Sequence, residues 1–209
     1  MNTQYKMKHY KTIKIFAWNI AFGLQEGKVS INLLDLSNRN IKGELSLQEV
    51  NKLIEENGLK EDILSSRIAN ILSTNAFSLR SIEYLLIHIK LFKGVLKFDY
   101  KNINESLEEL FTIENSFTYK GLTEDEIINH ISIFISKLWN LHIFEEGNTR
   151  TTAIYLIKYL NLMGYKNLNN IFKENYSYFK ESLIKSNEDI KDLELFIRDL
   201  VKNTEEYYS

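Results

Sequence analysis

The amino-acid sequence predicts an all-α protein. Three observations support this: the chain has no proline, apolar residues recur at helical spacing through most of its length, and no segment alternates apolar and polar residues as a strand does. Average usage of about 5% would place roughly ten prolines in a chain of 209 residues, so the commonest helix breaker is missing throughout. We therefore expect about seven or eight helices and no sheet.

Capping boxes mark the start of two helices. Ser46 with Glu49 predicts a short helix that ends at Gly58, and Thr123 with Glu126 predicts a helix of about five turns whose apolar face reaches His142. Apolar spacing predicts further helices over 63–72, 82–92, 104–111, 151–163, 170–185 and 189–201, with Gly94 ending the second of these and Gly164 following 151–163. Only the stretch around Ser30–Ser37 lacks a clear period, and we expect an irregular connector there.

The organisation predicted is a single domain over residues 1–209. No internal repeat, low-complexity tract or Gly/Ser linker interrupts the chain, and its length is sufficient to bury a core without disulfides. Residues 1–45 are expected to form an N-terminal extension that packs on a helical core over 46–203.

Composition excludes several classes of partner and site. A net charge of −2 gives no basic face for nucleic acid, and the absence of cysteine excludes disulfides and zinc–cysteine sites. The basic and apolar residues before Leu24 resemble a secretion signal only faintly, because Asn19 interrupts the apolar run and no small-residue cleavage site follows. The apolar stretch Ile127–Phe144 contains too many polar residues to span a bilayer. We expect a soluble, cytoplasmic protein that binds neither nucleic acid nor membrane.

Chemistry-bearing side chains gather between the two most apolar predicted helices, from His142 to Arg150. The N–H groups that open the second of these helices have no intrahelical acceptors, and with Arg150 they favour an anion such as phosphate. Gly147 lets the backbone approach that phosphate, Glu146 can hold Mg²⁺ beside it, and His142 is suited to act as general base. These residues predict phosphate-transfer chemistry, although each one taken singly also suits a helix cap, a loop or a buried stripe.

The pattern His142-x-Phe144-x-Glu146-Gly147-Asn148-x-Arg150 resembles the signature of the Fic domain family, His-Pro-Phe-x-Asp/Glu-Gly-Asn-Gly/Lys-Arg-x-x-Arg. Ala17–Gln25, Ser66–Ala69 and His88–Phe92 are similar to other segments of that family, so the resemblance covers most of the chain. It implies a Fic-type helical bundle with the motif loop between two antiparallel core helices. It also implies an adenylyltransferase that moves AMP from Mg-ATP to a Ser, Thr or Tyr hydroxyl of a target protein.

The resemblance assigns a role to each matching residue. His142 would be the general base, Glu146 the Mg²⁺ ligand, and Arg150 the clamp on the β-phosphate. Gly147, Asn148 and Thr149 would bind the nucleotide phosphates as an anion hole, and Phe144 would anchor the loop in the core without a chemical role.

The chain departs from the family pattern at four places. Ile143 replaces the motif proline, Thr149 the second glycine, and Ala153 the final arginine, which usually contacts the γ-phosphate. Loss of one charge-assisted contact would weaken ATP binding roughly ten- to a hundredfold. Residues Val95–Asn102 leave little room for the β-hairpin flap with which the family captures its targets.

Two alternative functions follow from these departures. The first is a degenerate Fic-like module that binds a nucleotide or a protein partner without turnover. The second is phosphotransfer in the manner of the related Doc toxins, which is less favoured because those proteins have lysine where this chain has Thr149. No complete autoinhibitory motif is present, and an antitoxin-like regulator remains a possible partner.

Other conspicuous residues are expected to have structural roles. His88 and His130 are expected to be structural, Tyr176, Tyr178 and Phe179 to pack in the core, and Glu108, Glu109 and Glu114 to form a solvated face.

Overall fold

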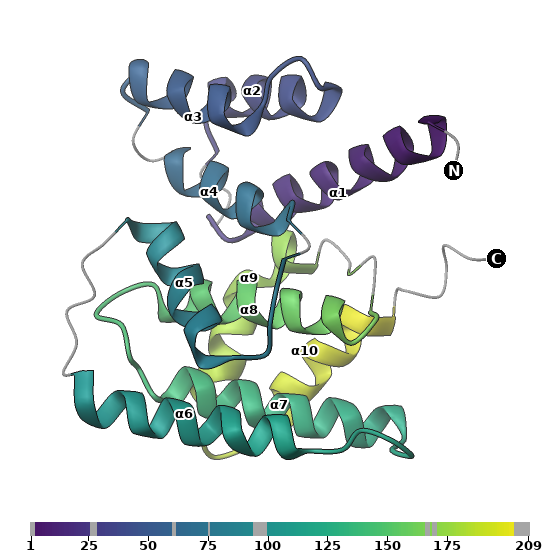
Figure 1. The fold of residues 1–209 in the computed structure, drawn as a ribbon, viewed down its shortest axis with the longest axis vertical. Coiled ribbons are helices and arrows are strands. Elements are labelled where there is room, and N and C mark those ends of the chain that lie inside the picture. Colours follow the sequence, from purple (N-terminus) through teal and green to yellow (C-terminus); the bar gives the residue numbers. More distant parts are fainter. Residues whose placement is uncertain are drawn as a thin grey trace. The chain divides into compact units, whose positions relative to one another are not determined.

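The chain is all-α, as its sequence predicts. A computed structural model describes residues 3–25, 29–59, 62–74, 76–93, 100–165, 168 and 171–202, and within these ranges it contains ten helices and no strand (Figure 1). The chain divides into two compact units. One comprises residues 1–75 with Phe172–Tyr176, and the other comprises residues 76–171 with 177–209. The prediction of a single domain over 1–209 stays a prediction.

The first unit is built from helices α1 (Thr3–Gly23), α2 (Ile31–Lys42), α3 (Leu47–Glu56) and α4 (Ile63–Leu72), and α1 packs on α2 and α4. The buried Asn40 of α2 connects α1 to the segment between α2 and α3. Its side chain accepts a hydrogen bond from the indole of Trp18 (3.0 Å) and donates one to Leu45 O (2.9 Å), while its carbonyl accepts from Lys14 (2.7 Å). One buried amide thus satisfies donors and acceptors from α1 and from the α2–α3 connection.

The expectation of an irregular connector over Ser30–Ser37 is wrong, because α2 occupies this segment. Ser30 is its N-cap, and the Ser30 hydroxyl accepts a hydrogen bond from Leu33 N at 3.0 Å. Leu33 and Leu36 are buried at helical spacing, and Gly43 ends the helix in the left-handed conformation with φ 83°. With α1, this helix accounts for the two helices beyond the expected number.

The second unit holds α5 (Ser81–Phe92), α6 (Tyr100–Ser116), α7 (Glu124–Asn140), α8 (Asn148–Leu162), α10 (Lys191–Lys202) and most of α9 (Ile171–Lys185). Helix α7 packs on α6, α8 and α10, and α5 packs on α8. Every residue of α8 from Thr151 to Leu160 is buried. Helix α8 is therefore the central helix of this unit, and its N-terminus is where the predicted motif ends.

Helix boundaries agree with the predicted capping signals in most places. Both capping boxes are present, at Ser46 and Thr123. Gly164 follows α8 with φ 100°, as predicted, and Tyr165 N donates to Leu160 O at 3.0 Å. Helix α6 is longer than the expected 104–111, since it spans Tyr100–Ser116. Helix α5 ends at Phe92, and its C-cap Lys93 is in the left-handed conformation with φ 46°. Gly94 and residues 95–99 of the connection lie outside the described residues.

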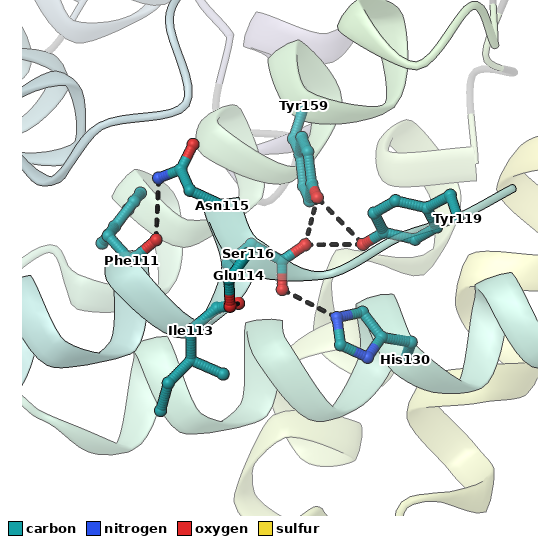
Figure 2. A network of polar contacts seen from close by, with 8 residues as sticks. All are labelled: Phe111, Ile113, Glu114, Asn115, Ser116, Tyr119, His130 and Tyr159. Atoms are coloured by element: carbon teal, nitrogen blue, oxygen red, sulfur yellow. Dashed lines mark hydrogen bonds and ion pairs between the residues drawn. The ribbon is translucent and has the colours of Figure 1, made fainter.

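The expectation that Glu114 lies on a solvated face is also wrong, although Glu108 and Glu109 are exposed. Glu114 is only 2% exposed, and its carboxylate accepts hydrogen bonds from the hydroxyls of Tyr119 (2.5 Å) and Tyr159 and contacts His130 Nε2 at 2.8 Å (Figure 2). Burial raises the pKa of both tyrosines, so the hydroxyls stay protonated as donors. His130 also stacks on Phe117 with ring centroids 3.4 Å apart, which agrees with a structural role.

No helix in the described part of the chain has the length and apolar character needed to cross a bilayer. The aromatic residues Tyr176 and Phe179 are buried, as expected, and Tyr178 is partly exposed.

Candidate functional site

The candidate site is the loop of residues 141–147, which connects α7 to α8. Two residues in the left-handed conformation, His142 (φ 46°) and Gly147 (φ 76°), lie near its two ends. The left-handed conformation is unfavourable for a side chain such as that of His142, so the hydrogen bonds around it must offset a cost of about 1–2 kcal/mol. The chain leaves α7 and enters α8 within these few residues, which keeps every motif side chain close to the N-terminus of α8.

The imidazole of His142 is exposed and is held by the end of α7. Its Nδ1 lies 2.8 Å from the backbone oxygen of Trp139, and its backbone N–H donates to the same oxygen at 3.1 Å. A carbonyl oxygen only accepts, so Nδ1 carries the proton and, in the neutral ring, Nε2 carries the free lone pair. This tautomer leaves Nε2 available to accept a proton from a hydroxyl group.

Phe144 anchors the loop in the core, as predicted. It is 5% exposed and stacks face to face on His88, with ring centroids 3.6 Å apart and planes 4° from parallel. Burial lowers the pKa of His88 to about 4, so this imidazole is neutral near pH 7. The Nδ1 atom of His88 lies 3.2 Å from the Thr151 hydroxyl. His88 thus links α5, the loop and the first turn of α8, which agrees with the structural role expected for it.

Asn148 closes the loop with its side chain. The Phe144 backbone N–H donates to Asn148 Oδ1 at 3.1 Å, and Asn148 Nδ2 donates to Phe144 O at 2.6 Å. This pair of hydrogen bonds gives both backbone polar groups of Phe144 a side-chain partner. The side chain of Asn148 therefore shapes the loop, and its backbone N–H lies at the start of α8.

Gly147 and Thr149 make close contacts on either side of Asn148. A Cβ atom on Gly147 would lie 2.3 Å from the ring of Phe92, so a larger residue would fit between the loop and α5 only if that ring moved. The hydroxyl of Thr149 accepts a hydrogen bond from the indole Nε1 of Trp139 at 3.2 Å. Both contacts are local consequences of the sharp entry of the chain into α8.

The start of α8 is electropositive. The first intrahelical hydrogen bond runs from Thr151 N to Gly147 O (2.9 Å), so the N–H groups of Asn148 and Thr149 precede the first closed turn. Arg150 lies in this turn, no acidic residue does, and Glu146 is exposed in the loop just before it. Ala153, at the position of the family's final arginine, is fully buried. Among the described residues, no group of three His, Asp or Glu side chains is arranged to hold a metal ion.

The structure brings some of the predicted residues into contact through partners that sequence reasoning missed. Trp139 contacts both His142 and Thr149, Phe92 packs on Gly147, and Tyr84 contacts both Phe144 and the Thr152 hydroxyl. Only Trp139 left a usable signal, since it lies three residues before His142, the spacing at which residues at a helix end meet. Phe92 and Tyr84 are on α5, far from the loop in sequence.

No protein-family model matches this chain, and comparison with curated proteins and with solved structures found no similar protein.

Proposed function

We propose that the protein is a Fic-type adenylyltransferase, which moves AMP from Mg-ATP to a hydroxyl group of a target protein. One observation carries the proposal. The exposed His142 donates a hydrogen bond from Nδ1 to the backbone carbonyl of Trp139, next to an electropositive helix N-terminus that includes Arg150. A base with a free Nε2 beside an anion-binding turn is the arrangement that phosphoryl or nucleotidyl transfer to a hydroxyl requires.

The proposed reaction is an in-line displacement at the α-phosphorus. Nε2 of His142 accepts the proton of the attacking Ser, Thr or Tyr hydroxyl, the hydroxyl oxygen bonds to the α-phosphorus, and the bond to the bridging oxygen breaks. Pyrophosphate leaves with the bonding electrons. The N–H groups of Asn148 and Thr149 and the guanidinium of Arg150 would stabilise the negative charge on the phosphates.

The residues present fit Mg²⁺ bound together with a nucleotide. Glu146 supplies one exposed carboxylate beside the α8 N-terminus, and Mg²⁺ commonly takes one or two carboxylates and completes its shell with phosphate oxygens and water. When bound, the ion would neutralise charge on the leaving phosphates. Glu146 would hold it, and Arg150 would bind phosphate.

The helical arrangement supports a Fic-type bundle in two respects. Helices α7 and α8 pack on each other on either side of the motif loop, and α8 is buried from Thr151 to Leu160, as a core helix should be. The anchoring of Phe144 against His88 agrees with the role that the resemblance gives to this phenylalanine.

The buried Ala153 favours a second candidate function. A methyl group in the core offers no charge to the terminal phosphate of ATP, so a module that binds a nucleotide or a protein partner without turnover is the alternative. An intact base and an exposed Glu146 oppose it, because binding without chemistry requires neither.

Intact-mass spectrometry tests the proposal. The purified protein is incubated with Mg²⁺ and each nucleoside triphosphate in turn, with and without a cell lysate as a source of targets. The proposal expects a nucleotidyl mass addition on the protein or on a lysate protein, lost in His142→Ala and strongly reduced in Glu146→Gln. Glu145→Gln is the matched control, since Glu145 is the exposed neighbouring carboxylate. Nucleotide binding without any addition would support the alternative.

A further inference from the structure

We propose that Trp139 is a positioning residue that holds the imidazole of His142 in a fixed relation to the first turn of α8. The inference rests on the proposed function, because it gives Trp139 a role only where His142 acts as the base. It assigns that role to a residue outside the motif, on the last turn of α7.

Trp139 controls both the backbone and the side chain of His142. The carbonyl of Trp139 accepts from the His142 backbone N–H and from Nδ1, at 3.1 and 2.8 Å. The two rings meet edge to face, with centroids 4.5 Å apart and planes at 86°. The carbonyl sets the tautomer and the indole limits the rotation of the imidazole, so a single residue fixes where Nε2 points.

The same indole is hydrogen-bonded to a residue of α8. Its Nε1 donates to the hydroxyl of Thr149 at 3.2 Å, across the reversal of the chain. Thr149 lies in the first turn of α8, whose N–H groups would bind the phosphates. The imidazole and the anion-binding turn are therefore connected through one rigid side chain, and displacement of the indole would change the distance between base and nucleotide.

In this arrangement the hydroxyl of Thr149 serves as the hydrogen-bond acceptor of the Trp139 indole. A glycine there would leave the indole N–H of a half-buried tryptophan without its acceptor, whereas the threonine hydroxyl supplies one. Trp139 and Thr149 form a matched pair, and we expect the two to act as a unit.

The experiment compares Trp139→Phe, Thr149→Val and the double variant, with Thr149→Ser as the conservative replacement. Thr112→Val is the control, because the Thr112 hydroxyl bonds a backbone carbonyl on α6, away from the loop. Two readouts are used: the ring ¹⁵N signals of His142 in the full chain, and kcat and KM for AMP transfer.

The inference expects the wild type to show a protonated Nδ1 in the neutral imidazole. Trp139→Phe and Thr149→Val keep the backbone carbonyl of residue 139 but remove or loosen the indole that limits the rotation of the imidazole, so the ring can turn away from that carbonyl. Both variants should therefore shift the ring signals toward a mixture of tautomers and lower kcat about three- to tenfold, the effect of one lost hydrogen bond. In the double variant kcat should fall no further than in the single variants. Thr149→Ser should restore the wild-type ring signals, and Thr112→Val should change neither readout.

Unchanged ring signals in both Trp139→Phe and Thr149→Val would overturn the inference, whatever happened to protein stability. Failure of the proposed function is separate: it would be seen as no AMP transfer by the wild type. The ¹⁵N signals would then still decide whether Trp139 orients His142, because they require no turnover.

Discussion

The ring of Phe92 occupies the space that a side chain on Gly147 would need: an ideal Cβ there would lie 2.3 Å from ring atoms Cε2 and Cζ. Gly147 also has φ 76°, a conformation that costs other residues roughly 1–2 kcal/mol. Two independent requirements for glycine thus coincide at the residue that leads into α8. Any other residue at this position would meet both costs, unless the Phe92 ring moved.

Gly147→Ala is expected to destabilise the protein more than a positive φ alone explains. Gly121→Ala is the matched control, since Gly121 has φ 87° but no atom within 4 Å of its Cβ position. We expect Gly121→Ala to lower the free energy of unfolding by roughly 1–2 kcal/mol and Gly147→Ala by about 1–3 kcal/mol more. Urea denaturation measures both. Equal costs would show that the contact with Phe92 is easily relieved.

Asn148→Ala is expected to open the motif loop. The substitution removes both hydrogen bonds to the backbone of Phe144 and leaves its N–H and C=O without these partners, at a cost of about 1–3 kcal/mol. Hydrogen exchange should show a faster Phe144 amide, while amides in the middle of α7 keep their wild-type rates. Unchanged exchange at Phe144 would mean that the loop is held by Phe144 packing alone.

Stability is expected to fall between about pH 6.5 and pH 4 because of His88. Burial lowers the pKa of His88 to about 4 in the folded protein, from 6.5 in the unfolded chain. Between these values the unfolded state binds more protons, so the contribution of His88 is complete above pH 6.5 and is lost as the pH falls. We expect a loss on the order of 2 kcal/mol relative to His88→Gln. Parallel stability curves for the two proteins would contradict a buried neutral imidazole.

Two tyrosines one turn apart on α8 should respond oppositely to replacement by phenylalanine. The Tyr159 hydroxyl donates to the buried Glu114 (Figure 2), so Tyr159→Phe should cost about 1.5–3 kcal/mol of unfolding free energy. The Tyr155 hydroxyl is buried and, among the described residues, has no hydrogen-bond partner. Tyr155→Phe should therefore be neutral or stabilising. A larger loss for Tyr155→Phe in thermal unfolding would contradict this account of the cluster.

Local signals were sufficient to predict most of the fold. The capping boxes at Ser46 and Thr123, and Gly164 after α8, lie within a few residues of the boundaries that they specify. Helix α2 was missed because two of its apolar residues, Ile31 and Leu34, are exposed and obscure the helical spacing of the buried Leu33 and Leu36. Its N-cap, Ser30, also carries no capping-box glutamate. Glu114 was misplaced because α6 was expected to end at Phe111, and because the partners that justify its burial come from the loop at Tyr119, from α7 and from α8.

The candidate site could be located from sequence because its residues are contiguous. Its supports could not be, since they depend on packing between distant segments. Phe144 meets His88 of α5, and Gly147 meets Phe92 of the same helix. No spacing rule relates such positions. The contact between Trp139 and Thr149 likewise requires the chain to reverse at His142, which has a positive φ of 46°. Sequence patterns do not predict a positive φ for a residue other than glycine at this position.

Labelled ATP tests the central claim most directly. The protein is incubated with Mg²⁺ and a lysate, using ATP labelled at the α-phosphate in one sample and at the γ-phosphate in another, beside His142→Ala. Adenylyl transfer with His142 as the base predicts that only the α-phosphate label becomes bound to protein, and that His142→Ala shows no such label. No label from the α-phosphate, equal α-label in His142→Ala, or transfer of the γ-label alone would contradict it.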